Sequence, residues 1–316
     1  MNVHNINQLI KNNEKENLEQ LKNNYTAEIY ELYSELFESK IGKLPKLQAQ
    51  LPLQPGSKPI YIKPRIVPYA LVEKIEGEIK SLEEAKIIER IENTEWGTSI
   101  VPILKPDGNV RICADYKITV NSQLQNNRYP IFRIEEIFNK LSGGKFFTTL
   151  DIYKAYLHVG MDDESAKIQG ICTHMGTYKV NRLMFGIKTA PNYWQSIMDR
   201  ILEGLNGVAC FFDDIVIKGS NLVELHKRTK EVLDHLKQNN LHVNRGKSKF
   251  FETSVKYLGH IVDSDGLHKT SDKIEAILNA PKPTTQTEVK QFLGLINYYY
   301  RFIPDLASKL HPLYQL

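Results

Sequence analysis

The chain has 316 residues, of which 41% are hydrophobic and 25% charged, and this balance excludes an intrinsically disordered protein. A formal net charge of +4 permits a polyanionic partner without requiring one. The three cysteines, Cys113, Cys172 and Cys210, are widely separated in sequence, which excludes a disulfide framework and the spacing of a zinc site. The sequence contains no apolar run of about twenty residues that could span a membrane. We therefore expect a soluble intracellular protein.

The first ninety residues predict helices on either side of an extended segment. Apolar residues recur at roughly helical spacing within residues 1–40, which predicts one or two amphipathic helices. Residues 42–64 contain several prolines and predict an extended linker. From Pro68 to Arg90 the helical spacing returns, and we expect one continuous helix there.

A hairpin of two strands is predicted over residues 99–104 and 110–114. The Pro-Asp-Gly sequence between them is typical of a tight turn. Lys105 at its start and Arg111 at its end could reach one phosphate together, although surface hairpins often carry such charges without a ligand.

The middle of the chain places one carboxylate at the end of a strand. Residues 130–141 predict a helix, and residues 145–150 predict a strand that Asp151 closes. Such an aspartate is either a helix cap or a functional carboxylate. A strand pair over residues 168–180 and a helix over residues 192–205 follow.

Two further carboxylates stand together in the segment 207–218, which predicts a strand, a tight turn and a second strand. Neighbouring side chains on a strand point to opposite faces, whereas at a two-residue turn Asp213 and Asp214 can lie at the same edge. Asp is also a good turn former, so the pair alone does not establish a site. A helix over residues 221–239 and a strand pair over residues 255–262 follow.

The three carboxylates together indicate metal-dependent chemistry at phosphorus. Asp151, Asp213 and Asp214 at one sheet edge could hold two Mg²⁺ ions, which prefer carboxylate oxygens. Two such ions, about 3.5–4 Å apart, suit an in-line displacement in which pyrophosphate leaves.

Several segments, in this order and spacing, resemble the reverse transcriptases of gypsy-type LTR retrotransposons: residues 63–70, 110–117, 150–156, 183–191, 211–214, 257–260 and 292–299. The resemblance implies an α+β right-hand polymerase fold with fingers, palm and thumb and an antiparallel palm sheet. It implies an N-terminal helical extension at 1–45, fingers at 46–125 and 159–189, palm at 126–158 and 190–263, and a thumb or connection at 264–316 that ends before any ribonuclease H domain.

The resemblance also implies roles for individual residues. Asp151, Asp213 and Asp214 would be the catalytic residues and the ligands of two Mg²⁺ ions, which Mn²⁺ could replace. The nucleotide site would comprise Lys105 and Arg111 on the triphosphate, the backbone of Ile152, Tyr156 as a steric gate against the 2′-hydroxyl, and Phe185 with Gly186 beneath the nucleotide. Leu258 and Gly259 would form the primer grip.

The implied function is that of an RNA-directed DNA polymerase. It would use an RNA template, a DNA primer/template and dNTPs, without a membrane partner, as a segment of a polyprotein whose ribonuclease H and integrase domains lie elsewhere. We expect a cytoplasmic protein, with a particle-associated or nuclear location as alternatives. Phe211 stands where most of the family has tyrosine, and Phe212 is bulkier than usual. The alternative is therefore a catalytically inactive nucleic-acid-binding remnant.

Overall fold

The computed structural model describes residues 3–105, 108–126, 129–269, 279, 281–297 and 305–314. The chain divides into two compact units, Met1–Val255 and Lys256–Leu316. The helices of the first unit are α1 (Val3–Leu32), η1 (Ser34–Phe37), η2 (Tyr69–Leu71), α2 (Val72–Glu84), α3 (Ile134–Leu141), η3 (Ala155–His158), α4 (Asp163–Ile168), α5 (Ala190–Ile201) and α6 (Leu222–Gln238). Within this described part, no helix is both long enough and apolar enough to cross a bilayer.

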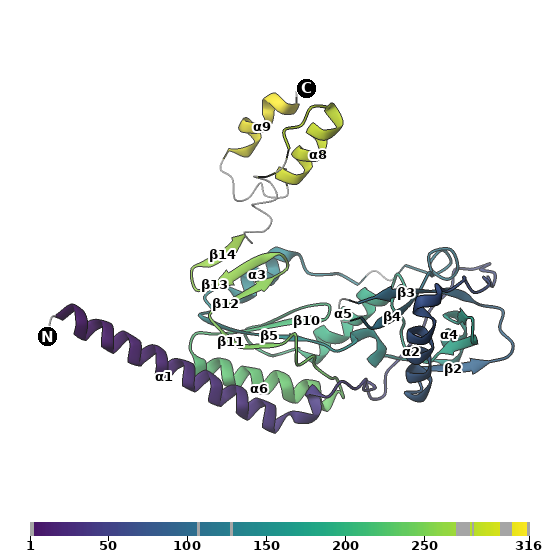
Figure 1. Cartoon of the computed structure of the whole chain (residues 1–316), viewed down its shortest axis with the longest axis horizontal. Coiled ribbons are helices and arrows are strands. Elements are labelled where there is room, and N and C mark those ends of the chain that lie inside the picture. Colours follow the sequence, from purple (N-terminus) through teal and green to yellow (C-terminus); the bar gives the residue numbers. More distant parts are fainter. Residues whose placement is uncertain are drawn as a thin grey trace. The chain divides into compact units, whose positions relative to one another are not determined.

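One four-stranded sheet carries all three aspartates, and we call it the aspartate sheet. Its strand order is β11 (Lys249–Glu252), β5 (Phe146–Asp151), β10 (Asp214–Gly219) and β9 (Val208–Phe211), all antiparallel. Three consecutive residues of β10, Ile215, Val216 and Ile217, have no exposed surface, because both faces of the strand are covered. Figure 1 shows α6 and α3 on opposite sides of this sheet, and both contact β10.

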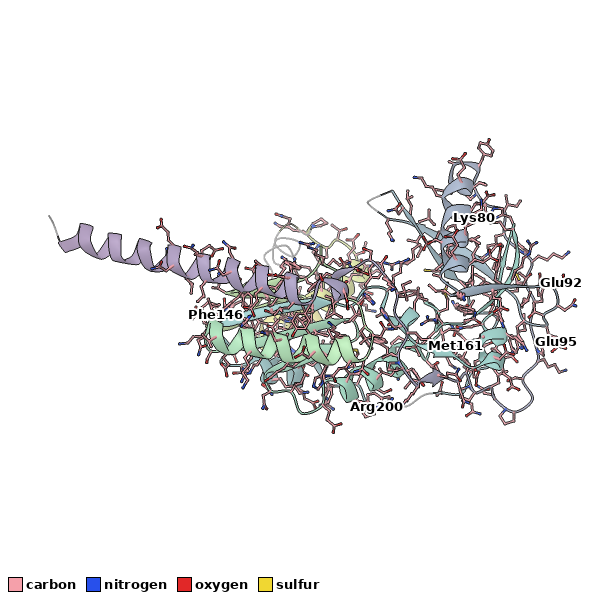
Figure 2. The ribbon with its side chains drawn as sticks, turned by 90° about the horizontal axis from the view of Figure 1, so that it is seen from below. Lys80, Glu92, Glu95, Phe146, Met161 and Arg200 are labelled. Carbon is pink, nitrogen blue, oxygen red and sulfur yellow. The ribbon has the colours of Figure 1, made fainter. Side chains whose placement is uncertain are left out.

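A second sheet has five strands, in the order β2 (Ile88–Ile91), β8 (Gly176–Val180), β7 (Ile171–Thr173), β3 (Thr98–Leu104) and β4 (Val110–Ala114). The β3–β7 pair is parallel and the other pairs are antiparallel. Helix α2 packs on β4 and β2, and α4 packs on β8. At this end of the unit, Figure 2 shows the exposed side chains of Lys80, Glu92 and Glu95 pointing into solvent. The strands fall in the segments 88–114 and 171–180, but the domain boundaries given above stay predictions.

The single helix predicted from Pro68 to Arg90 is wrong in its last six residues. Helix α2 ends at Glu84, and Lys86 then adopts a left-handed backbone with φ +55°. That conformation ends the helix in the manner usual for glycine, which the sequence lacks at this position. Ile87 and Ile88 are 1% exposed, and β2 that follows pairs with β8, so the apolar residues belong to a strand.

The predicted linker at 42–64 is extended but is not free of the core. It contains the two-residue strand β1 (Gln48–Ala49), which pairs in parallel with β6 (Gly160–Met161). Leu44, Ala49 and Leu51 are buried in the same hydrophobic core as the sheets. The prolines therefore correctly predicted an extended backbone at 42–64, but the prediction that this segment is a linker outside the core is wrong.

The predicted N-terminal helix is confirmed as α1, which lies along α6 in Figure 1. Its C-terminal end is joined to α6 by polar contacts: Lys230 Nζ lies 3.0 Å from Glu28 Oε1, and the Tyr33 hydroxyl donates to Asp234 Oδ1 at 2.7 Å. The ring of Tyr25 stacks on His226 at 4.1 Å between centroids. The helix therefore closes the side of the aspartate sheet that α6 covers.

The second unit has its own small sheet and helix pair. Its sheet order is β12 (Ser254–Tyr257), β13 (His260–Asp263) and β14 (Gly266–Lys269). Helices α8 (Gln286–Asn297) and α9 (Leu306–Tyr314) pack through Leu293, Leu306 and Leu310. Within the predicted thumb, residues 270–278, 280, 298–304 and 315–316 lie outside the described residues.

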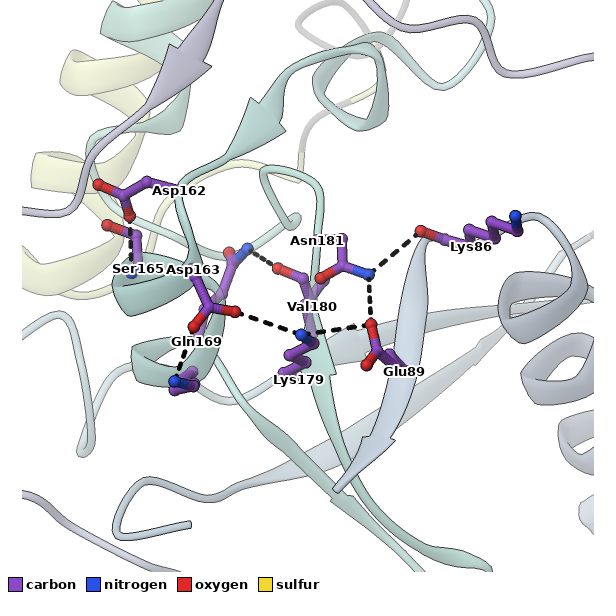
Figure 3. A network of polar contacts seen from close by, with 10 residues as sticks. Lys86, Glu89, Asp162, Asp163, Ser165, Gln169, Lys179, Val180 and Asn181 are labelled. Atoms are coloured by element: carbon purple, nitrogen blue, oxygen red, sulfur yellow. Dashed lines mark hydrogen bonds and ion pairs between the residues drawn. The ribbon is translucent and has the colours of Figure 1, made fainter. Parts of the chain in front are cut away.

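A buried glutamine ties the five-stranded sheet to the loop that follows it. Gln169 is fully buried, and its Nε2 donates to the carbonyls of Val180 at 2.8 Å and Arg182 at 2.6 Å. Its Oε1 accepts from the Met184 N–H at 3.2 Å. In Figure 3 it sits beside a surface network in which Lys179 lies between Asp163 and Glu89. Gln169 therefore fixes the backbone that leads to Phe185.

We predict that Gln169→Leu lowers the free energy of unfolding of the first unit by about 2–3 kcal/mol, because it leaves three buried backbone groups without their partner. Urea unfolding followed by tryptophan fluorescence measures this, since Trp96 and Trp194 both lie in that unit. As a control, Gln54→Leu removes one bond from an exposed side chain to the Leu124 carbonyl and should change the value by less than about 0.5 kcal/mol. Equal losses in both variants would contradict the role given to Gln169.

Candidate active site

The three aspartates meet at one end of the aspartate sheet. Asp151 ends β5 and Asp214 begins β10, and the two are direct partners in the antiparallel ladder. Direct partners put their side chains on the same face, with Cβ atoms about 4.5–5.5 Å apart. Asp213 lies next to this pair in the β9–β10 turn, and its carbonyl accepts from the Ile152 N–H at 3.0 Å. Strand register thus brings together carboxylates that are sixty residues apart.

The turn between β9 and β10 lies one residue earlier than predicted. Phe212 and Asp213 form it, whereas Asp214 is already part of β10. Phe212 has φ +54°, in the left-handed region that costs a bulky residue about 1–2 kcal/mol. The preference of aspartate for turns suggested the wrong pair, because phenylalanine is a poor residue for this conformation.

Helix α5 holds this turn through its backbone. Gln195 Oε1 accepts from the Phe212 N–H at 2.7 Å, and Trp194 Nε1 donates to the Phe212 carbonyl at 2.9 Å. Gln195 Nε2 also donates to the Cys210 carbonyl at 3.2 Å and to Asp199 Oδ1 at 2.8 Å. Trp194 and Gln195 are at most 1% exposed. The sequence predicted a helix over residues 192–205, but it did not identify Gln195 as a residue that holds the turn.

A loop before β11 surrounds Asp151. The Asn244 N–H donates to the Asp151 carbonyl at 2.7 Å, and the Asp151 N–H donates to Ser248 Oγ at 3.3 Å. Lys247 Nζ lies 3.1 Å from Asp151 Oδ2. Residues 245–248 do not complete a phosphate-binding P-loop motif, and the structure shows instead that their loop positions a carboxylate. The position of Lys247 in the sequence, far from Asp151, gave no signal of this contact.

Burial and neighbouring charge disfavour the ionised forms of Asp151 and Asp214. Partial burial, followed by the charges of Asp213 and Asp151, raises the pKa of Asp214 to about 6, even though the residue as a whole is exposed. Burial also raises the pKa of Asp151, against the opposing effect of Lys247. Negative charge is therefore concentrated at this end of the sheet, where a cation would relieve it.

A row of aromatic rings connects β4 to the aspartates. Arg111 Cζ lies 5.5 Å from the centre of the Phe185 ring, the Phe185 and Tyr156 centroids are 5.1 Å apart, and those of Tyr156 and Trp194 are 6.2 Å apart. Burial, with the charge of Asp213, raises the pKa of Tyr156 to about 12. The structure thus places Arg111, Phe185 and Tyr156 in one continuous group beside the aspartates.

The backbone at Gly186 passes close to β4. Gly186 has φ +96°, and a Cβ there would lie 2.8 Å from the Ala114 carbonyl oxygen, so only glycine fits. Asn121 holds this loop from the other side, because its Nδ2 donates to the Gly186 carbonyl and its Oδ1 accepts from the Lys188 N–H, both at 2.8 Å. Sequence reasoning identified Gly186 and missed Asn121.

The remaining predicted residues lie in turns. The Lys105 N–H donates to the Asn109 carbonyl at 2.8 Å at the end of the β3–β4 hairpin, while Pro106 and Asp107 of the predicted turn lie outside the described residues. Leu258 and Gly259 form the β12–β13 turn of the second unit, with φ +47° and +76°. Their assignment as a primer grip stays a prediction.

The donor set suits a hard divalent ion, but the side chains are not arranged as a finished metal site. Among the described residues, no three His, Cys, Asp or Glu side chains are gathered closely enough to hold an ion. The oxygen donors nevertheless match the preference of Mg²⁺, and a bound cation would offset the burial and the neighbouring negative charges that raise the pKa of Asp214. Metal binding at these aspartates thus requires them to reorient, with Asp151 exchanging its contact to Lys247.

Comparison with known proteins identifies the family. The profile described as "Reverse transcriptase (RNA-dependent DNA polymerase)" matches residues 103–262. An uncharacterized Caenorhabditis elegans protein, K02A2.6, is 34% identical over 275 residues, covering 86% of this chain and 22% of the relative. The retrovirus-related Pol polyprotein from transposon 297 of Drosophila melanogaster is 32% identical, covering 81% of this chain and 25% of the relative. The chain thus spans about a quarter of the length of these relatives.

A solved structure confirms the predicted fold. The foamy viral protease-reverse transcriptase dRH, determined in complex with double-stranded DNA, superposes with a TM-score of 0.83 and 22% sequence identity. The match covers 92% of this chain and 51% of that chain. The α+β right-hand polymerase fold is therefore shared.

We predict that Asp214→Asn stabilises the metal-free protein at pH 7.5 and that this gain disappears toward pH 4. A folded-state pKa of about 6, above the usual value of about 3.9, contributes stability that is present below pH 4 and is lost as pH rises through 6. Urea midpoints of both proteins in EDTA at several pH values measure the difference.

Asp163→Asn is the matched control, because Lys167 and Lys179 lower the pKa of Asp163. Its pH dependence should have the opposite sign, since a lowered carboxyl pKa contributes stability at neutral pH that acid removes. A pH-independent gain in Asp214→Asn would show that burial and the neighbouring carboxylates do not raise the pKa of Asp214 in the folded protein.

Proposed function

The chain belongs to the reverse transcriptase (RNA-dependent DNA polymerase) family, in the group found in the Pol polyproteins of LTR retrotransposons, and from this premise we propose that it is an RNA-directed DNA polymerase. The observation that carries the proposal is the register pair of Asp151 and Asp214 with Asp213 in the adjoining turn. Its substrates would be dNTPs, with an RNA template and a DNA primer/template.

We propose that Asp151, Asp213 and Asp214 hold two divalent ions, Mg²⁺ or Mn²⁺, with the backbone carbonyl of Ile152 nearby. When bound, such ions supply charge stabilisation at the phosphorus and activation of the primer hydroxyl. The protein's own contribution is to keep the three carboxylates in register. Lys247 neutralises part of their charge while Asp151 is not bound to a metal ion.

The aromatic row suits the nucleotide. Tyr156, supported by Phe185 and Trp194, would present its ring beneath the sugar and exclude a 2′-hydroxyl. Arg111 and Lys105 would bind the triphosphate, since guanidinium and ammonium groups donate strong charge-assisted hydrogen bonds to phosphate. Gly186 would let the loop approach closely, and Leu258 with Gly259 would contact the primer.

The alternative is an inactive nucleic-acid-binding remnant, which Phe211 and Phe212 suggest. Their rings contact each other at 4.4 Å between centroids, and Phe212 packs against the core. Both phenylalanines are accommodated while the Asp151–Asp214 register is kept, and this favours the active enzyme. Ribonuclease H and integrase activities would come from other parts of the polyprotein, in an intracellular, cytoplasmic, particle-associated or nuclear setting.

We predict that the protein extends a DNA primer annealed to homopolymeric RNA when Mg²⁺ and the matching dNTP are supplied. Asp213→Asn should lower kcat by at least about 10³-fold, because a lost ligand removes several kcal/mol of transition-state stabilisation. Fluorescence anisotropy of labelled primer/template should show unchanged binding. If the wild-type protein binds primer/template but does not extend it, the remnant is the correct interpretation.

We predict that Tyr156→Ala lowers the preference for dNTPs over rNTPs by about 10–100-fold, because the space for a 2′-hydroxyl opens. Single-nucleotide incorporation with each substrate measures the ratio of kcat/KM values. Tyr156→Phe keeps the ring and should keep the discrimination. Unchanged discrimination in Tyr156→Ala, in a protein that still extends primers, would remove the steric-gate assignment.

A further inference from the structure

Helix α2 contacts two different segments of the proposed nucleotide site from one of its faces. Lys74 Nζ donates to the Gly108 carbonyl at 2.8 Å, and Glu78 Oε1 lies 3.3 Å from Lys154 Nζ. Residues 74 and 78 are four apart in the helix, so their side chains lie on the same face. One rigid element therefore contacts both the β3–β4 turn and the segment after β5.

Each contact falls within a segment to which the proposed function assigns a role. Gly108 lies between Lys105 and Arg111, which would bind the triphosphate. Lys154 lies between Asp151 and Tyr156, at a left-handed position with φ +46° directly before η3. The Leu157 N–H donates to the Lys154 carbonyl at 3.0 Å, so the position of Lys154 is tied to the turn that carries Tyr156.

The β3–β4 hairpin is exposed on its β3 side next to the turn. Strand β4 is at the edge of its sheet, and Ile103 and Leu104 before the turn are 48% and 55% exposed, whereas Val110 after it is 3% exposed. The contact from Lys74 therefore ties to α2 a turn that is packed from one side only.

The ion pair that Glu78 makes one helical turn after Lys74 is partly shielded from water. The side chains of Glu78 and Lys154 are 25% and 23% exposed, against 55% and 63% for the surface pair Lys167–Asp163. Partial burial reduces screening, so this pair holds its geometry better than a surface pair does.

We propose that α2 is a brace that sets the distance between the triphosphate-binding hairpin and the loop carrying Asp151 and Tyr156. Lys74, Glu78 and Lys154 are its positioning residues. This inference rests on the proposed function. It adds Lys74, Glu78 and Lys154 to the nucleotide site as residues that act indirectly, by positioning Arg111, Lys105 and Tyr156. Loosening the brace would misplace the triphosphate relative to the sugar, which weakens nucleotide binding more than primer/template binding.

The first test needs no catalysis. Hydrogen exchange of the nucleotide-free protein should be at least about threefold faster at the Lys105 and Gly108 amides in Lys74→Met, and at the Leu157 amide in Glu78→Gln. Both amide sets are hydrogen-bonded across their turns. Unchanged exchange at these amides would overturn the brace, whether or not the protein is a polymerase.

The second test is kinetic. Glu78→Gln and Lys154→Met should each raise the KM for dNTP by about 3–10-fold with kcat within about twofold, and the double variant should be no worse than either, because both remove one shared contact. The charge-swapped Glu78→Lys/Lys154→Glu protein should recover the wild-type KM within about twofold. The Kd for primer/template should not change in any variant.

Lys179→Met is the matched control. Lys179 forms ion pairs with Glu89 and Asp163 in the same unit, as Figure 3 shows, but contacts none of the proposed nucleotide residues. Its KM for dNTP should be unchanged. If Lys154→Met is far worse than Glu78→Gln and the swap does not recover, Lys154 binds the triphosphate itself and the brace is wrong. If the wild-type protein extends no primer, the proposed function fails, while the exchange experiment still decides the brace.

Discussion

The candidate site depends on one strained turn that a helix holds from behind. Phe212 adopts a left-handed backbone that a bulky side chain disfavours, and Trp194 and Gln195 of α5 compensate by hydrogen-bonding both its N–H and its carbonyl. This turn decides where β10 begins and hence that Asp214 pairs with Asp151. A slip of one residue would move every side chain of β10 to the opposite face, so the metal-binding arrangement proposed here follows from this backbone contact.

At the end of the aspartate sheet where Asp151, Asp213 and Asp214 meet, a nearby lysine partly offsets the negative charge in the metal-free protein. Asp151 and Asp214 both have raised pKa values, and Lys247 Nζ lies 3.1 Å from Asp151 Oδ2. The hydrogen bonds from Asn244 and to Ser248 hold the backbone of Asp151 while its side chain remains able to exchange partners. The backbone of Asp151 is therefore held in place, whereas its carboxylate oxygens can exchange one partner for another.

The sequence predicted those features that leave a periodic apolar pattern or a chemically distinctive side chain. Apolar spacing predicted α6 closely, and the carboxylates could be identified because aspartates at strand ends are chemically distinctive. Gln195 and Asn121 bind distant backbone groups and Lys247 binds the distant carboxylate of Asp151, and contacts between residues so far apart in sequence leave no local pattern. The helix predicted through Arg90 failed at Lys86, where a lysine takes the left-handed conformation expected of glycine.

Both hydrogen bonds that α5 makes to Phe212 go to backbone atoms, so neither depends on the side chain at that position. The two contacts that hold the turn remain available when the side chain at position 212 changes. In evolutionary terms this corner of the molecule is modular, because the contacts that keep the aspartate register are separate from the side chain that the turn presents. A lineage can therefore change the residue at position 212 without first losing the backbone contacts that keep Asp214 paired with Asp151.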